Sequence, residues 1–353
     1  MSDLTILLTL KGRKIFTKRW LDWMSIEKCP YKILLADGDE DKSFTKDLIS
    51  DYRYHDLDFE YLEYPFDKDI STFMHKVSDL SNKVSSRYVV MADNDDFLLI
   101  NNLKKAVNYF EQNQNIGTLA LPHYRFAINN ASKEKINLDD ISDIHFQKLK
   151  RLNNNNLFSD DPIIRLQEAI NKFPSDFIYY GLHKTKNFKR ISNYLTKIVI
   201  DDLLFFEWFI TYGYPVLGTI CCPIELKPFV IRQEETSTSA GVLPKLSELI
   251  LRPNWSRQLE TMRESLSNLY SEKDQKGKVI IKEKFNQSFL EMMKMVNVAA
   301  KIGSYLNKYR TLYLVCGKIY AILRGKGRTD LSHREVKKDI YLNKLTQFLK
   351  RKT

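Results

Sequence analysis

The sequence is poor in the residues that build zinc sites and disulfides. It has four cysteines and six histidines among 353 residues, with no Cys-x-x-Cys pair, no His-Glu-x-x-His motif and no other zinc-ligand spacing. Cys221 and Cys222 are adjacent, which disfavours a disulfide between them. We therefore expect no zinc site, and a reducing, cytoplasmic location.

Long apolar runs and glycine-rich nucleotide motifs are also missing. No stretch reaches the ~18 uncharged apolar residues of a membrane span. The apolar run Leu4–Leu10 is preceded by Asp3 and followed by Lys11, so it lacks the length and flanks of a signal peptide. Neither Gly-x-Gly-x-x-Gly nor a P-loop motif occurs, which disfavours a dinucleotide-binding dehydrogenase and a P-loop enzyme.

Acidic residues are scarce only near the end of the chain. The formal net charge is +11, from 55 Lys and Arg against 44 Asp and Glu. Residues 301–353 contain 14 basic and three acidic side chains, which accounts for the whole excess, so the first 300 residues are neutral. A charge of +11 suggests an anionic partner, but only the C-terminal part of the chain carries it.

Short apolar runs alternate with amphipathic segments over the first 130 residues. On the helix expected at 70–84, Phe73, Val77 and Leu80 fall on one stripe. Strands that alternate with helices form βαβ units, so we expect an α/β fold with a mainly parallel sheet and flanking helices. The expected strands are 4–10, 31–36, 59–64, 87–92 and 116–121, and the expected helices are 16–24, 70–84 and 99–110.

The second half of the chain is less regular. Residues 129–162 are polar and predict a loop-rich excursion. A helix is expected to end at a Gly213 C-cap, and from residue 246 the pattern is helical without strands. At about 150 residues per domain the length allows two domains. We expect an α/β domain at 1–240 and a helical region with a basic tail at 241–353.

Three acidic clusters lie where strands are expected to end. They are Asp37-Gly38-Asp39, Asp93-Asn94-Asp95-Asp96 and Asp201-Asp202. Ligands of open α/β sheets bind at the carboxyl ends of the strands. Crowded carboxylates repel one another unless a cation neutralises them, and Mg²⁺-type sites use one or two carboxylates with substrate phosphates. The alternative for each cluster is a turn or a helix N-cap, which Asp and Asn also favour.

The order of these motifs, over residues 4–235, resembles the GT-A glycosyltransferases, and more narrowly family 2, of the bacterial surface-polysaccharide type. Ala36-Asp37-Gly38 is similar to the turn whose Asp contacts the nucleotide base, with Ala36 in place of the first Asp. Met91–Asp96 resembles the DxD-type motif that holds a metal. Ile200–Leu203 resembles the segment with the catalytic base, and Ile231–Gln233 an Arg-Gln element seen after the core.

The resemblance implies an inverting, metal-dependent glycosyltransferase that uses Mn²⁺ or Mg²⁺ and a nucleotide-sugar donor, with a UDP-sugar expected. The acceptor would be a glycan or a lipid-linked saccharide at the inner face of a bacterial plasma membrane. Asp202 would be the general base, and Asp93, Asp95 and Asp96 would hold the metal. We expect donor contacts from Thr9, Lys11, Arg13, Asp37, Asp93, Asn94 and Arg232, and acceptor contacts from His123, His183 and Asp201.

The basic tail leaves two interpretations open. Residues 285–323 are expected to be helical and mix Tyr, Leu and Ile with Lys and Arg. Such a helix suits an anionic membrane surface, or it packs on the catalytic domain with its basic face in solvent. Residues 346–353 are expected to be a frayed end. Nucleic-acid binding is disfavoured because no nucleic-acid module is visible. The alternative function is a non-catalytic membrane- or nucleic-acid-binding protein with a degenerate GT-A domain.

Overall fold

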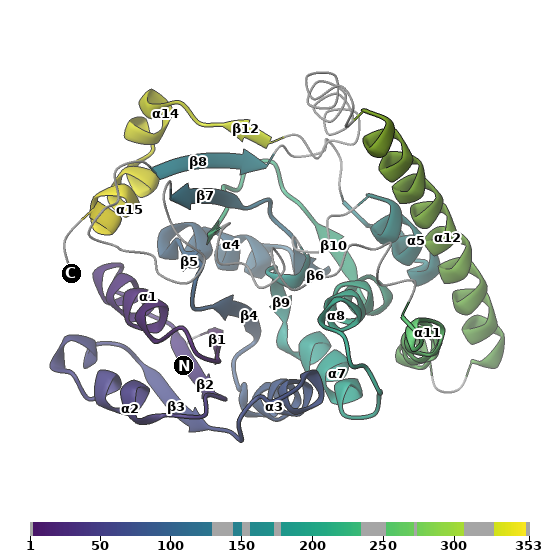
Figure 1. Cartoon of the computed structure of the whole chain (residues 1–353), viewed down its shortest axis with the longest axis horizontal. Coiled ribbons are helices and arrows are strands. Elements are labelled where there is room, and N and C mark those ends of the chain that lie inside the picture. The colour runs from purple at the N-terminus through teal and green to yellow at the C-terminus, as the bar shows by residue number, and fades with distance from the viewer. Residues whose placement is uncertain are drawn as a thin grey trace.

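A seven-stranded sheet lies at the centre of the molecule (Figure 1). The computed structural model describes residues 3–128, 144–149, 156–172, 178–233, 252–271, 274–306 and 328–350. The strands of this sheet are β1 (Leu4–Leu10), β2 (Lys32–Asp37), β3 (Phe59–Glu63), β4 (Tyr88–Asp93), β6 (Ile116–Leu119), β9 (Leu182–Lys184) and β10 (Thr219–Cys221). Their order is β10-β6-β9-β4-β1-β2-β3.

The four strands nearest the N-terminus are parallel, as the sequence predicts. β1 lies between β2 and β4, and its register sets Thr9 beside Asp93 and Leu10 beside Asp37. β1, β2 and β4 are buried on both faces, which explains their continuous apolar runs. β9 is antiparallel to both β4 and β6, so the sheet is mixed. The expected α/β class with a mainly parallel sheet is confirmed.

Helices cover the sheet, and their amphipathic patterns explain how they pack. The helices of the first 217 residues are α1 (Lys14–Ile26), α2 (Ser43–Ile49), α3 (Ile70–Lys83), α4 (Ile100–Gln112), α5 (Pro162–Lys172), α7 (Thr185–Leu195) and α8 (Leu203–Leu217), with a 3₁₀ turn η1 (Tyr52–Tyr54). In α3, the Asp69 carboxylate accepts from the Thr72 N–H at 2.8 Å and caps the helix, and Val77 and Leu80 are buried.

A second sheet lies above the first in Figure 1, with the order β12-β8-β7-β11-β5. Its strands are β5 (Phe97–Leu98), β7 (Tyr124–Ile128), β8 (Ile144–Leu149), β11 (Val230–Gln233) and β12 (Arg328–Asp330). β8 and β12 correct two expectations, since 129–162 was expected to be loop-rich and the chain beyond 246 free of strands. Both strands pair antiparallel, β8 with β7 and β12 with β8, so ladder hydrogen bonds compensate for weak local patterns.

The end of α8 also differs from the prediction. The helix passes through Gly213, which was expected to cap it, and ends at a Gly218 C-cap, whose N–H donates to the Tyr214 carbonyl. Gly213 serves packing instead, because a Cβ there would lie 3.1 Å from Ile191 and 3.2 Å from Leu269. The missing side chain thus lets α7 and α11 (Trp255–Tyr270) approach α8 closely.

The C-terminal helices are α11, α12 (Gln275–Leu306), α14 (His333–Lys338) and α15 (Ile340–Lys350). α12 forms the right edge of the molecule in Figure 1 and packs with α5 and α11. The expected domain boundary near residue 240 lies outside the described residues, and so do residues 307–327 of the basic tail. Within the described ranges, every helix is too short or too polar to cross a membrane.

α15 corrects the expectation of a frayed end at 346–353, because residues 346–350 are helical. The Phe348 ring lies 5.3 Å from that of Trp23 and 6.1 Å from that of Phe97, between centroids. Lys344 forms an ion pair of 2.5 Å with Glu27. The apolar positions of this helix, Leu342, Leu345, Phe348 and Leu349, are buried. Packing on α1, rather than local propensity, keeps this helix ordered.

We predict that Phe348→Ala lowers the free energy of unfolding by about 3 kcal/mol, because it opens a cavity between Trp23 and Phe97. Ile340→Ala, at a position 76% exposed on the same helix, is the matched control and should cost under about 0.5 kcal/mol. Urea unfolding followed by tryptophan fluorescence measures both. Equal, small losses in the two variants would show that α15 does not pack on α1.

Candidate active site

A pocket of about 420 Å³ lies at the carboxyl ends of β1 and β4. This is the edge of the sheet at which the sequence places its acidic clusters, and the volume suits a small-molecule ligand. The polar lining comes from the β1–α1 loop, the loop before α3, the turn after β4, the segment before β9, the start of α8, and β11. The charged and aromatic lining residues are Lys11, Arg13, Asp67, Asp69, Phe73, Lys76, Asp93, Asp95, Tyr179, Tyr180, Asp201, Glu207 and Arg232.

The pocket brings together many, but not all, of the residues that the sequence singles out. Those that line it are Thr9, Lys11, Arg13, Asp93, Asn94, Asp95, Asp201 and Arg232. Those that do not are Asp37, Asp96, His123, His183 and Asp202.

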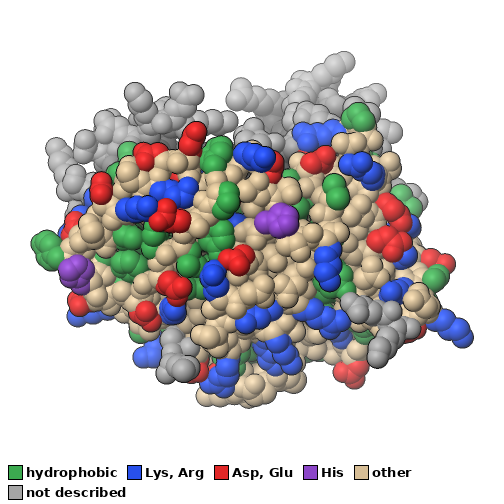
Figure 2. Space-filling view, turned by 90° about the horizontal axis from the view of Figure 1, so that it is seen from below, with side chains coloured by type: hydrophobic (Ala, Val, Ile, Leu, Met, Phe, Trp, Pro, Cys, Tyr) green, Lys and Arg blue, Asp and Glu red, His purple; other side chains and the backbone are tan. Residues whose placement is uncertain are grey.

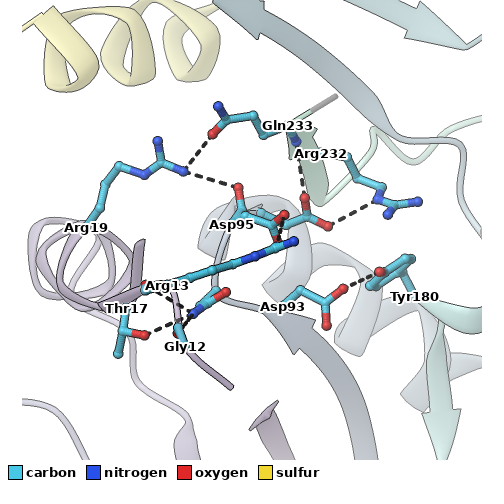
Figure 3. Close-up of polar contacts among 11 residues, drawn as sticks. Gly12, Arg13, Thr17, Arg19, Asp93, Asp95, Tyr180, Arg232 and Gln233 are labelled. Carbon is cyan, nitrogen blue, oxygen red and sulfur yellow. Dashed lines mark hydrogen bonds and ion pairs between the residues drawn. The ribbon is translucent and has the colours of Figure 1, made fainter. Parts of the chain in front are cut away.

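The turn after β4 is held by arginine from the opposite loop (Figure 3). Arg13 Nη1 lies 2.5 Å from Asp95 Oδ2, and the Asp95 side chain is only 5% exposed. Arg13 has φ 58° and ψ 45°, a left-handed conformation that costs a non-glycine residue about 1 kcal/mol. Gly12, before it, has φ 62°. The loop thus adopts an unfavourable backbone conformation, and this conformation directs the Arg13 guanidinium at Asp95.

Two further contacts fix this turn to α1. Asn94 Nδ2 donates to Thr17 Oγ1 at 3.0 Å and lies 3.4 Å from the Gly12 carbonyl oxygen. The buried Arg19 donates through Nη2 to the Asp95 carbonyl at 3.3 Å and to Gln233 Oε1 at 2.7 Å. Asn94 therefore lines the pocket with its amide already engaged, and Arg19 joins the turn to β11 (Figure 3).

Asp96, expected to be a metal ligand, is directed away from the pocket. Its Oδ2 accepts from Arg232 Nε at 3.1 Å and its Oδ1 from the Gln233 N–H at 3.1 Å, so both oxygens are engaged with β11. Burial raises the pKa of Asp96 above its ordinary value, and the Arg232 guanidinium opposes this by favouring the ionised form. Asp96 thus anchors β11 to the turn.

Asp93 and Arg232 meet at Tyr180. The Tyr180 hydroxyl donates to Asp93 Oδ2, and the Arg232 guanidinium lies over the Tyr180 ring, 4.4 Å from its centroid. Burial, together with the Asp95 charge, raises the pKa of the Asp93 carboxyl above its ordinary value. A buried carboxylate beside another negative charge is stabilised by a nearby cation. The Tyr180 ring holds one such cation, Arg232, at the pocket wall.

The donor set of the pocket fits a divalent ion only in part. Within the described ranges, no three His, Cys, Asp or Glu side chains gather as a metal cluster, so a three-carboxylate site is not formed. Asp93 and Asp95 do line the pocket together. Two carboxylates suit Mn²⁺ or Mg²⁺ when substrate phosphates complete the coordination. The residues therefore fit an ion that arrives with a phosphate ligand.

The floor of the pocket contains a buried ion pair that the sequence analysis missed. Lys76 Nζ binds Asp67 Oδ2, and the two side chains are 1% and 2% exposed. Lys76 also donates to the Leu10 carbonyl at 3.2 Å, and Lys11 donates to the Asp67 carbonyl. Burial lowers the pKa of Lys76 and raises that of Asp67, since each charged form loses hydration. Gly38 is needed here, because a Cβ would lie 2.3 Å from Asp67 Oδ2.

Asp37, expected to contact the nucleotide base, is fully buried beneath this floor. Its Oδ1 accepts from the Asp39 N–H at 2.8 Å and its Oδ2 from the Tyr61 hydroxyl at 2.9 Å. Both carboxylate oxygens thus stabilise the turn after β2. In this conformation Asp37 supports the loop and does not reach the pocket.

Asp201 and Asp202, at the start of α8, have different surroundings. Asp202 caps the helix, with Oδ1 accepting from the Leu204 N–H at 2.9 Å, and its Oδ2 lies 2.5 Å from Arg252 Nη1. Asp201 lines the pocket, with Asn254 Nδ2 3.2 Å from its Oδ2. Glu207, one turn along α8, also lines the pocket. The N-cap alternative for Asp202 is therefore realised, and Asp201 is the member of the pair at the pocket wall.

The two histidines expected to contact an acceptor are both buried. His183, on β9, has Nδ1 3.0 Å from Thr118 Oγ1, and its ring stacks on Tyr214 with centroids 3.7 Å apart. His123 is 1% exposed, and its ring packs edge-on against Tyr180. A fully enclosed imidazole contacts only protein, so the structure places both rings in the core rather than at the pocket.

A local signal existed for only some of the missed residues. Lys76 lies three residues after Phe73 and four before Leu80, so helical spacing already puts it on the buried stripe of α3. A lysine on such a stripe points to a buried acid. Tyr179 and Tyr180 follow no such rule, because only the antiparallel insertion of β9 brings them beside Asp93.

We predict that Lys76→Met lowers the free energy of unfolding by about 3 kcal/mol, because it leaves the Asp67 carboxylate buried without its ion-pair partner. Lys76→Met combined with Asp67→Asn should recover part of this loss, since the charge is then removed from both sides. Chemical unfolding of the three proteins measures the effect. A single variant as stable as the parent would show that the pair is not buried in solution.

His183 should make stability depend on pH. Burial lowers its pKa from an ordinary 6.5 to about 3. Below about pH 6.5 the His183 imidazole binds a proton in the unfolded chain but stays neutral in the folded chain. The free energy of unfolding therefore falls as the pH decreases, by up to ~1.4 kcal/mol per pH unit. Unfolding between about pH 6.5 and 4.5 should show a smaller slope for His183→Gln, while the exposed His55→Gln control keeps the parental slope. Identical slopes in all three would contradict the assignment.

No protein-family model matches this chain, and no curated protein matches it. Among solved structures it is similar to residues 1–349 of S. aureus TarS, with 10% identity and a TM-score of 0.46, over 86% of this chain and 92% of that one. The structure of the same TarS residues in complex with UDP has 12% sequence identity and a TM-score of 0.44, over 86% of this chain and 92% of that one. The mannosyltransferase PcManGT from Pyrobaculum calidifontis, in complex with GDP-Man and Mn²⁺, has 13% sequence identity and a TM-score of 0.44, over 98% of this chain and 84% of that one. Identities and TM-scores this low do not identify a function, so the function of this chain has to be inferred from its own residues.

Proposed function

We propose that this protein is a glycosyltransferase that moves a sugar, with inversion, from a nucleotide-sugar donor to a hydroxyl group of an acceptor, with Mn²⁺ or Mg²⁺. The observation that carries the proposal is that the carboxylates Asp93 and Asp95 line the same pocket as the cations Lys11, Arg13 and Arg232. A diphosphate with a divalent ion needs both kinds of group at once.

The cations of the pocket wall would hold the diphosphate of the donor. Arg13 comes from the β1–α1 loop and Arg232 from β11, so they approach from two sides of the turn after β4 (Figure 3). Arg232 is already fixed by Asp96 and by the Tyr180 ring, which reduces the ordering that donor binding requires. A guanidinium can bind two phosphate oxygens in parallel, and this orients the donor.

Asp93 and Asp95 would hold the divalent ion. When bound, such an ion stabilises negative charge on the departing nucleoside diphosphate. The Tyr180 hydroxyl keeps one oxygen of Asp93 in place and Arg13 contacts one oxygen of Asp95, so each carboxylate enters the reaction with its orientation already set.

A carboxylate at the start of α8 would take the proton of the acceptor hydroxyl. The resemblance assigns this role to Asp202, while Asp201 is the residue that lines the pocket. Asp202 can serve only if Arg252, whose side chain is 48% exposed, releases it. Asparagine variants at the two positions distinguish these assignments, because asparagine keeps the shape and removes the base.

We predict that donor hydrolysis or transfer requires Mn²⁺ or Mg²⁺ and is lost with a chelator. Asp95→Asn should lower kcat by about 100-fold, through the loss of metal and diphosphate binding. Either Asp201→Asn or Asp202→Asn should lower kcat by about 100-fold, and the other by less than about tenfold. Nucleoside diphosphate release, measured with several nucleotide-sugars, is the assay.

Asp47→Asn, at an exposed position of α2, is the matched control and should keep full activity. Circular dichroism confirms that each variant is folded. The proposal fails if Asp95→Asn, and both variants at the start of α8, remain as active as the parent. Calorimetry with UDP, with and without Mn²⁺, tests the alternative: absence of UDP binding, with salt-sensitive binding of nucleic acid, supports a non-catalytic adaptor.

A further inference from the structure

A second pocket of about 470 Å³ lies at the opposite end of β4. Tyr88, the first residue of β4, lines it, whereas Asp93, the last, lines the first pocket. Five residue steps along a strand separate these ends by ~16 Å. The other walls are the loop before β4, Gln114 and the start of α7, with Ser85, Ser86, Lys184 and Thr185 among the lining residues. None of these residues belongs to the candidate active site.

The charged residues that line this pocket are all basic: Arg87, Lys184, Lys186 and Lys189. Two carboxylates lie near, and Arg87 binds both, Asp3 at 3.0 Å and Glu111 at 2.8 Å. Burial lowers the pKa of Lys184, and the nearby positive charge of Lys186 lowers it further. Figure 2, which shows the side of α3 and α7, has Lys and Arg side chains gathered over its lower middle.

The N-terminus of α7 opens at this pocket. The N-cap residue, Lys184, supplies no side-chain acceptor for the first turn, and the Thr185 N–H donates to the Arg87 carbonyl at 2.9 Å. The next N–H groups of a helix have no acceptor within the helix, and the helix dipole adds partial positive charge. The first turn of α7 therefore favours an anion.

Thr185 Oγ1 is the independent sign of a ligand. The residue is only 7% exposed, it lines the pocket, and its hydroxyl has no hydrogen-bond partner among the described residues. A buried hydroxyl without a partner costs about 1–3 kcal/mol. A ligand oxygen in the pocket would accept this hydrogen bond and remove the cost.

We propose that this pocket binds the phosphate group of a phosphorylated ligand. The Thr185 hydroxyl, the Lys186 ammonium and the N–H groups of the first turn of α7 all belong to the lining, and the several oxygens of a phosphate accept from several donors at once. The phosphate belongs either to a soluble phosphate ester or to a lipid headgroup. The inference does not depend on the proposed glycosyl transfer.

Binding of inorganic phosphate to the full-length chain, measured by calorimetry at low salt, tests the site. Thr185→Val keeps the shape and removes the hydroxyl, and should weaken the Kd by about tenfold, whereas Thr185→Ser should bind like the parent. Lys186→Gln should weaken it severalfold, and Lys104→Gln, at an exposed position of α4, should not. Equal affinity in Thr185→Val and the parent would overturn the proposal.

Vesicles distinguish the two sources of the phosphate. Flotation with phosphatidic acid, but not with phosphatidylcholine, that Thr185→Val and Lys186→Gln both reduce would assign the site to a lipid headgroup. Phosphate binding without such flotation would assign it to a soluble ester. Absence of both, or flotation that the variants leave unchanged, would overturn the proposal. Donor hydrolysis in Thr185→Val should stay at the parental level, which separates this test from that of the first pocket.

Discussion

The structure depends on the neutralisation of the acidic turn after β4 by arginines from distant parts of the chain. Arg13 and Arg19 reach it from the β1–α1 segment, and Arg232 reaches it from β11. Carboxylates as buried as Asp95 and Asp96 would cost several kcal/mol if they were unpaired. The turn can therefore keep its shape only when α1 and β11 are both in place, and the pocket forms together with the junction of the two sheets.

Much of the fold and part of the site could be predicted because their signals are local. Continuous apolar runs mark β1, β2 and β4, and parallel strands end at one edge, which brings Asp93 and Lys11 into one pocket. β8 and β12 could not be predicted in this way. Each is stabilised mainly by a partner strand, and β12 lies about 180 residues from β8 in the sequence.

The polar residues show a different limit. Asp37, Asp96 and His183 have the residue types of a catalytic site, yet each is enclosed by partners that sequence spacing does not reveal. A carboxylate can bind a ligand or hold a loop, and only the three-dimensional surroundings decide between the two. Tyr180 shows the opposite case. Its sequence surroundings predict a core residue, but its hydroxyl and ring contact Asp93 and Arg232 at the pocket.

The packing of α15 on α1 has a consequence for synthesis. Glu27 and Lys344, which join the two helices, are 317 positions apart. At about 5–20 residues per second, the ribosome needs roughly 15 to 60 s to make the segment between them. During that time Trp23 has Phe97 as a neighbour, but the side of its ring that Phe348 covers stays open, because Phe348 has yet to be made. The nascent N-terminal half therefore exposes an apolar surface of the kind that chaperones bind, until α15 covers it.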